Sequence, residues 1–305
     1  MSERTEFEWP TLALIVLCHG LWALATGWIA AWSLPLALVL TALTITLHSS
    51  LQHEVLHGHP FRRRLLNEAL VFLPIGLVFP YGRFRDLHLA HHHDESLTDP
   101  YDDPESNYLD PAVWNRLAAP VRWLLRLNNT LAGRMLLGPA ISVVALLRGD
   151  LRLILAGDRA VARDWLLHGL GLVPVLWWIA LSPVPFWLYL LAAYAGFSIL
   201  KIRTFLEHRA HRLARGRTVI VEGGWILPFL FLNNNLHVVH HSRPRLAWYR
   251  LPAYYRSRRE EFLRRNEGYR YASYGEIFRR HLFRAKDPVP HPLWPDPQDG
   301  AVPDR

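Results

Sequence analysis

The chain has 305 residues, of which 51% are hydrophobic and 13 are Trp, and its formal net charge is +8. This positive charge does not indicate a nucleic-acid-binding protein, because the basic residues flank long apolar segments. Lipid headgroups on the cytoplasmic face of a membrane are the expected partner of such residues. The single cysteine, Cys18, excludes an intramolecular disulfide and a cysteine-based metal site.

Two segments of the chain contain no Asp, Glu, Lys or Arg, and each is long enough to cross a membrane twice. They extend from residue 9 to 53 and from residue 165 to 200. A crossing needs about 20 apolar residues, and a charge at the bilayer centre costs about 2.5–3.5 kcal/mol. We therefore predict four transmembrane helices in two hairpins, at about residues 10–30, 34–51, 165–181 and 184–201.

The two predicted hairpin turns carry no charge, and this sets the expected orientation. Ser33 and Pro35 mark the first turn, and Ser182, Pro183 and Pro185 mark the second. All 34 basic residues then lie on one side of the membrane, which the positive-inside rule makes cytoplasmic. We therefore expect a multi-pass membrane protein with both termini in the cytoplasm.

Two further charge-free segments, residues 69–82 and 135–147, are too short to cross a membrane. We predict that they form interfacial or re-entrant helices; the alternative is that they are buried amphipathic helices of the cytoplasmic part. Together these elements predict an all-α integral membrane fold with a cytoplasmic helical cap. We expect one domain over residues 1–287 and an irregular tail, residues 288–305, that is rich in Pro and Asp.

Three histidine clusters lie just after or between the apolar segments, on the predicted cytoplasmic side. The first has the pattern HxxxH (His53 and His57), and the other two have the pattern HxxHH (His88, His91 and His92; His237, His240 and His241). Because a helix turns about 100° per residue, each cluster can direct its imidazoles toward one point. A single His pair often arises by chance, but three such clusters favour a site for a pair of metal ions, with iron or zinc as the first candidates.

The order and spacing of the three clusters resemble those of the integral-membrane fatty acid desaturases, over about residues 10–255. The resemblance implies four membrane helices, a cytoplasmic cap and two iron ions (Fe²⁺) bound by the eight clustered histidines. It also implies a ninth ligand just after the fourth span, for which His208 is the best match and His211 the rival. Some members have an Asn four residues before the ninth histidine, where this chain has Thr204.

The activity that this resemblance implies is desaturation of an acyl chain, with O₂ as co-substrate, at the cytoplasmic face of a membrane. Hydroxylases, ketolases and terminal-alkene-forming decarboxylases share the motifs, so these reactions stay open. The sequence has no haem motif and no Cys cluster, and we expect a separate electron donor of the ferredoxin or cytochrome type with its reductase. The basic runs at residues 62–64 and 256–265 are candidate docking surfaces for an acidic donor; lipid binding is the alternative.

Acidic and amide side chains next to the histidines are candidates for orienting the imidazoles. Glu207 and Asn235 are the preferred ones, whereas Glu54, Asp94 and Glu95 are expected to be ordinary caps or surface charges. Two further histidines, His59 and His93, point about 200° away from the neighbouring ligand positions on a helix and are not expected to bind metal.

The first cluster also fits a different class of enzyme. Residues 53–57 form an HExxH motif, in which His53 and His57 would bind zinc and Glu54 would act as the general base of an intramembrane metalloprotease. That hypothesis needs a further ligand and leaves both HxxHH clusters unexplained. A non-enzymatic metal or haem carrier is a third hypothesis, and it does not explain why the histidines of each cluster converge.

Overall fold

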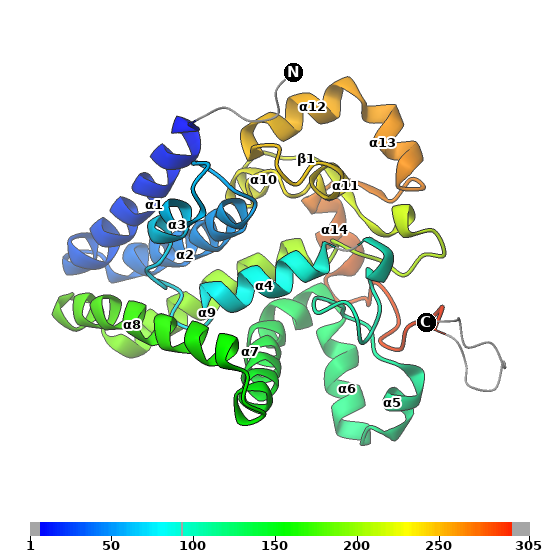
Figure 1. Cartoon of the computed structure of the whole chain (residues 1–305), viewed down its shortest axis with the longest axis horizontal. Helices are drawn as coiled ribbons and strands as arrows, with labels where there is room; N and C mark the ends of the chain where they lie inside the picture. Colours follow the sequence, from blue (N-terminus) through cyan, green and yellow to red (C-terminus); the bar gives the residue numbers. More distant parts are fainter. Residues whose placement is uncertain (1–6, 93, 295–305) are drawn as a thin grey trace.

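Two helical hairpins form one side of the molecule in the computed structural model, which describes residues 7–92 and 94–294. The first hairpin consists of α1 (Trp9–Gly27), the short helix η1 (Ile29–Ala31) and α2 (Leu34–Leu56), and the second consists of α8 (Arg159–Leu181) and α9 (Phe186–Thr204). The α1–α2 and α8–α9 connections both lie at the left of Figure 1. All four predicted spans therefore coincide with helices that are long and apolar enough to cross a membrane.

The two hairpins pack closely because small and hydroxyl-bearing residues lie where α2 meets α9. A Cβ atom on Gly196 would lie 2.8 Å from the carbonyl oxygen of Ala42, so only glycine allows this approach. The hydroxyl of Thr46 donates to the carbonyl oxygen of Gly196 at 2.8 Å. Across the same core, the hydroxyl of Tyr189 accepts from Trp22 Nε1 at 2.8 Å and donates to the carbonyl oxygen of Ile75 at 2.6 Å. These polar side chains are satisfied inside the bundle, as a membrane requires.

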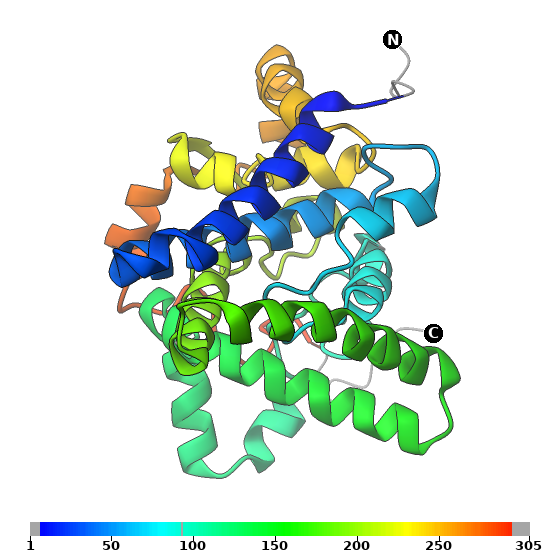
Figure 2. The same cartoon turned by 90° about the vertical axis from the view of Figure 1, so that its left-hand side faces the viewer.

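A fifth helix, α7 (Leu131–Leu155), is also long and apolar enough to cross a membrane, which brings the number of candidate spans to five in the described part of the chain. The helix that contains residues 135–147 is therefore longer than the charge-free run indicated, and its placement at the membrane interface stays a prediction. The charge-free run was a poor measure of this helix, because α7 continues through the buried Arg134 at one end, and through the exposed Arg148 and the buried Asp150 at the other. Figure 2 shows α7 beside α8 in green, joined by a short turn.

The segment at residues 69–82 is a loop for most of its length, which corrects the prediction of an interfacial or re-entrant helix there. It connects α3 (Arg64–Leu70) to α4 (Tyr81–His91). Pro74 and Pro80 remove backbone donors that a helix needs, and Leu77 has a φ of 68°. The loop places Ile75 in the core, where the side chain is fully buried.

The remaining elements form a cap at the opposite ends of the hairpins. They are η2 (Asp94–Ser96), α5 (Pro111–Arg116), α6 (Ala119–Asn128), η3 (Ala214–Arg217), β1 (Ile220–Gly223), α10 (Ile226–Leu230), α11 (His237–Ser242), η4 (Trp248–Arg250), α12 (Leu251–Ser257), α13 (Arg259–Arg265), β2 (Arg270–Ser273) and α14 (Tyr274–His281). In Figure 1, α10 to α13 lie in the upper part of the picture, from the middle to the right, away from the hairpin turns.

The cap is not entirely helical, so the all-α prediction was incomplete. Strands β1 and β2 pair in parallel, with Ile220 opposite Arg270 and Val221 opposite Tyr271. The β-branched run at residues 218–221 favours a strand, but four residues are too few for the pattern to stand out. Between the cap and the hairpins, a core cluster joins Leu51 and Val55 of α2 to Phe205, Phe231 and Tyr271, which lies in β2.

The predicted tail begins as irregular structure. Residues 288–294 contain no helix, and Pro290 forms a parallel bridge with Leu109. The remainder of that predicted tail, residues 295–305, lies outside the described residues.

The positions of the hairpin turns can be tested by labelling single cysteines from either side of the membrane. Because both turns lie on the same side of the molecule, Ser33→Cys and Ser182→Cys should react with an impermeant reagent from one side only, and Arg256→Cys on α12 from the other. The native Cys18 is 1% exposed, and a Cys18→Ala background removes any residual signal. Labelling of Ser182→Cys from the same side as Arg256→Cys would refute the two-hairpin arrangement.

Candidate metal centre

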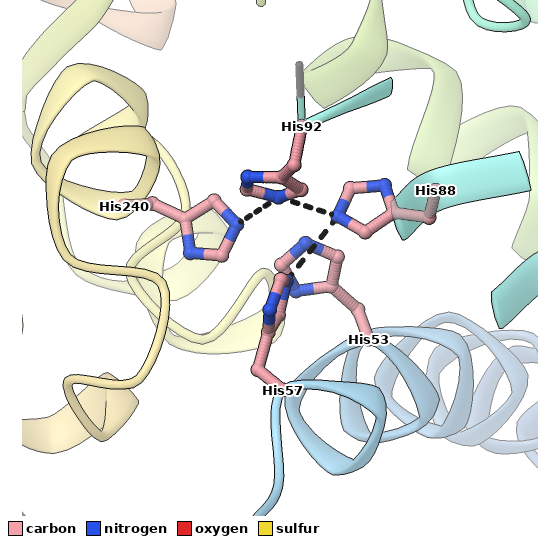
Figure 3. A group of neighbouring side chains, drawn as sticks. All are labelled: His53, His57, His88, His92 and His240. Carbon is pink, nitrogen blue, oxygen red and sulfur yellow. Dashed lines mark hydrogen bonds between the residues drawn. The ribbon is translucent and has the colours of Figure 1, made fainter. Parts of the chain in front are cut away.

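Five of the nine predicted ligands form one compact group, called here the first histidine group. Its members come from α2 and the residue after it, from α4 and the residue after it, and from α11: His53, His57, His88, His92 and His240. One ring nitrogen from each lies within 4.8 Å of the others. Figure 3 shows the five rings directed toward one another from three separate segments of the chain.

The other four predicted ligands form the second histidine group: His91, His208, His237 and His241. Its ring nitrogens also lie within 4.8 Å of one another. The Nε2 atom of His208 is 2.9 Å from Nε2 of His91 and 3.1 Å from Nε2 of His237. The structure thus gathers all nine predicted residues into two groups of five and four.

Helix geometry explains why each HxxHH cluster contributes to both groups. Residues four apart lie on the same helical face, one turn from each other. His88 and His92 therefore join the first group together, and His237 and His241 join the second together. The third histidine of each cluster faces the other group. The sequence predicted that the three histidines of each HxxHH cluster converge on one point. In the structure, two of them enter one histidine group and the third enters the other.

His208 and His211 have different surroundings, although both follow α9. The helix ends at Thr204, so the two residues do not share a helical face as the sequence suggested. His208 is held by a bridge to Thr218 and enters the second group. The Nδ1 atom of His211 instead accepts from the backbone nitrogen of Leu213 at 3.2 Å. His93 lies outside the described residues.

The hydrogen bonds of the imidazoles show that the groups fit metal ions. Nδ1 of His88 lies 2.8 Å from Oε1 of Glu105, and Nδ1 of His237 lies 2.9 Å from Oδ1 of Asn234. Since these oxygens are acceptors, each Nδ1 carries the hydrogen, and Nε2 of a neutral ring then presents a lone pair. Nε2 of His88 nevertheless lies 3.0 Å from Nε2 of His92 and 3.3 Å from Nε2 of His57. Converging lone pairs at such distances call for a cation between them.

The spacing of these nitrogens also matches a metal ion. Imidazole nitrogens bind transition metals at about 2.0–2.1 Å, so two ligands at right angles on one ion lie about 3 Å apart. Five Nε2 pairs within the two groups are 2.9 to 3.3 Å apart. In addition, Nε2 of His53 is buried and has no hydrogen-bond partner among the described residues. The residues present therefore suit two metal ions.

Burial shifts the protonation of the histidines in the direction that metal binding requires. It lowers the pKa of His57, His237 and His240 well below the usual range, so these rings are neutral at neutral pH. Burial also opposes a charge on His91, but Glu105 and Asp103 outweigh it and raise the pKa of His91 to about 9. The two carboxylates thus favour positive charge at this ring, and a bound metal ion would take the place of the proton.

Two carboxylates that the sequence did not single out contact the histidines directly. Oδ1 of Asp103 lies 2.7 Å from Nδ1 of His91, and Oε1 of Glu105 lies 2.8 Å from Nδ1 of His88. Glu105 also extends Oε2 to within 3.9 Å of Nε2 of His91, so it contacts both groups. The acidic run at residues 102–105 follows the second cluster closely, and this proximity was the available signal.

Of the two residues that were expected to orient the imidazoles, Glu207 lies near a histidine and Asn235 does not. Glu207 is buried, with Oε1 3.7 Å from Nδ1 of His237 and 3.1 Å from Nε of Arg203. The amide of Asn235 donates to the carbonyl oxygen of Val221 instead. Its neighbour Asn234 makes the contact with His237 and also donates to Glu207 at 3.3 Å.

Glu54 of the HExxH motif faces away from both histidine groups. Its Oε1 accepts from the backbone nitrogen of Trp248 at 2.9 Å and lies 3.7 Å from Nε2 of His59. His59 in turn contacts the carboxylate of Glu8 at 2.7 Å. A general base has to reach the reacting water at the metal, and this carboxylate is committed to joining α2 to the chain's beginning and to η4. The arrangement argues against a metalloprotease.

Comparison with protein families agrees with the geometry. Residues 26–273 match the model of the fatty acid desaturase family. The match covers more than half of the chain and contains all nine histidines, so the chain belongs to this family and is an oxidoreductase of the acyl-chain-modifying type. No curated protein matches the sequence.

The choice between His208 and His211 can be tested by metal analysis. His208→Ala removes a nitrogen from the second group and should lower the iron content of the purified protein and abolish turnover. His211→Ala is the matched control and should keep both, because this ring contacts only its own loop. Elemental mass spectrometry measures the metal. Equal iron loss in the two variants would contradict the assignment.

The carboxylates next to the histidines can be tested in the same way. Replacing an outer partner of a metal-bound imidazole lowers metal affinity about 10–100-fold. We therefore expect this loss in Asp103→Asn and Glu105→Gln, measured by competition with a chelator. Glu54→Gln is the control, since the amide can still accept from Trp248, and its metal affinity should stay at the wild-type value. A lower metal affinity in Glu54→Gln, with wild-type affinity in Asp103→Asn and Glu105→Gln, would instead support the zinc metalloprotease hypothesis.

Proposed function

We propose that the chain is a di-iron, O₂-dependent membrane desaturase that introduces a double bond into an acyl chain. The observation that carries this proposal is the pair of adjoining histidine groups, five and four imidazoles with carboxylate partners, in a chain of the fatty acid desaturase family. Imidazole is a good ligand for iron. Two iron ions would be held by five and by four imidazoles, and would supply the binding of O₂ next to the substrate.

A cavity of about 600 Å³ beside the histidines supports an acyl substrate. Glu105, Glu207 and His208 form part of its wall, so it reaches the metal centre. Much of the remaining wall is apolar and comes from α2, α4, α7 and α9, with Phe84 and Phe197 among its side chains. Cavities of this size, mainly apolar with a few polar groups, are typical of small-molecule sites.

Two iron ions, when bound, supply the activation of O₂ and the removal of hydrogen from an unactivated carbon. The nine imidazoles would hold them, and Asp103, Glu105 and Asn234 would fix the ring orientations through Nδ1. Formation of a double bond removes two hydrogens from the chain, and reduction of O₂ to two waters requires two further electrons and two protons. A ferredoxin- or cytochrome-type donor with its reductase would provide these electrons.

The donor would dock on the cytoplasmic side, where we also place both termini. Basic side chains of α12 and α13 are candidates for this surface, but they do not contribute equally. Arg259 and Arg270 both pair with the carboxylate of Glu222, so much of their charge is neutralised. Arg256 and Arg265 are exposed and form no ion pair with a described carboxylate, and they are the better candidates to attract an acidic donor.

Mass spectrometry of lipids and free acids from a host that expresses the protein tests the proposal. Wild-type protein should produce species that have lost two hydrogens, in an O₂-dependent manner, and the inactive variant His240→Ala should not. Chelation should abolish the product, and added Fe²⁺, but not Zn²⁺, should restore it. Products that have gained one oxygen would identify the reaction as hydroxylation, and shortened alkenes would identify it as decarboxylation.

A further inference from the structure

Two cationic side chains in the wall of the cavity have no anionic partner. Seven charged residues line it: Arg83, Glu105, Arg134, Asp150, Lys201, Arg203 and Glu207. Arg83 pairs with Asp150 through two hydrogen bonds of 2.8 and 3.0 Å, and Arg203 pairs with Glu207. Glu105 is committed to the histidines. Arg134 and Lys201 remain, and neither forms an ion pair with a described carboxylate.

The neighbours of these two cations are neutral. Nζ of Lys201 donates to the hydroxyl oxygen of Ser142 at 2.7 Å. The guanidinium of Arg134 is buried and donates to the carbonyl oxygen of Asn128 at 3.0 Å and to the side-chain oxygens of Asn107 and Asn129. These contacts satisfy hydrogen bonds without cancelling charge. Arginine has five N–H donors and lysine three, so both retain donors for a ligand.

Uncompensated charges at this place in a membrane protein favour a functional explanation. Arg134 lies in α7 and Lys201 in α9, and both helices are apolar enough to span a membrane. A buried charge without a counterion is unfavourable, and charged side chains inside membrane segments commonly mark a ligand site. Both cations face the same cavity as His208 of the metal centre.

We propose that the cavity binds an amphipathic acid whose free carboxylate is held by Lys201 and Arg134. The hydrocarbon part lies against the apolar wall, where the metal centre can reach it. This inference rests on the proposed function for the fate of the substrate, whereas the binding itself does not require turnover. A single-chain acid suits a cavity of about 600 Å³, and the carboxylate would bring the summed charge of the seven lining groups, four cations against three anions, to zero.

Calorimetric titration of decanoate into the full-length protein in zwitterionic nanodiscs tests this proposal. Empty nanodiscs provide the baseline, and decan-1-ol and methyl decanoate are the uncharged probes. We expect wild-type protein to prefer decanoate to both. Lys201→Met removes the charge but keeps an unbranched chain, and should weaken decanoate about tenfold while leaving decan-1-ol unchanged.

Three matched variants separate the charge from other effects. Lys201→Arg keeps the charge, and Ser142→Ala removes only the hydrogen bond to Lys201, so both should retain decanoate binding. Arg148→Gln removes one positive charge from an exposed position of α7, the helix that also carries Arg134. This variant should bind decanoate like the wild type.

Three results would overturn the proposal: equal decanoate affinity in Lys201→Met and wild type, no preference of the wild type for decanoate over decan-1-ol, or displacement of decanoate by phosphatidylglycerol at lower concentration than by free acids. The last result would identify a lipid phosphate as the bound anion. Iron content and desaturation are measured on the same samples. Wild-type protein that contains iron and binds decanoate but shows no desaturation would refute the proposed function and leave the carboxylate site in place.

Discussion

The structure depends above all on the approach of nine imidazoles to one another inside the protein. Rings whose Nδ1 atoms face Glu105, Asp103 and Asn234 direct their Nε2 atoms at neighbouring imidazole nitrogens about 3 Å away. Such an arrangement is repulsive without cations and strongly favourable with them. Two of the contributing helices, α2 and α4, also carry their clusters at the C-terminal end, where the helix dipole is negative and stabilises positive charge.

Charge compensation in the rest of the buried region follows a consistent pattern. Arg83 with Asp150, and Arg203 with Glu207, are paired across or along helices near the metal centre. Each pair places a cation in an apolar bundle without net charge, and the attraction between the two charges offsets part of their desolvation cost. Against this background the two unpaired cations, Arg134 and Lys201, are exceptional, and both lie in the wall of the proposed substrate cavity.

The sequence predicted the parts of the molecule that depend on local periodicity. The four long apolar helices and the eight clustered histidines follow from helix geometry and from the exclusion of charge from a bilayer, whereas His208 was expected only from the resemblance to the desaturases. It did not predict contacts made across the fold: Asp103 and Glu105 are ten or more residues from the histidines they contact, and Asn234 replaces its neighbour Asn235 because the chain leaves helical geometry before α11. The length of α7 was missed because the charge-free criterion stops at Arg134 and at the exposed Arg148, whereas the helix runs from Leu131 to Leu155 and its buried Asp150 pairs with Arg83.

The division of each HxxHH cluster between the two groups has a thermodynamic consequence. α4 supplies His88 and His91 to different groups, and α11 does the same with His240 and His237. An ion in either group therefore restrains the backbone that carries ligands for the other, so part of the ordering entropy of the second site is already spent when the first is filled. Metal uptake should accordingly be positively cooperative, with singly loaded molecules scarce at half saturation.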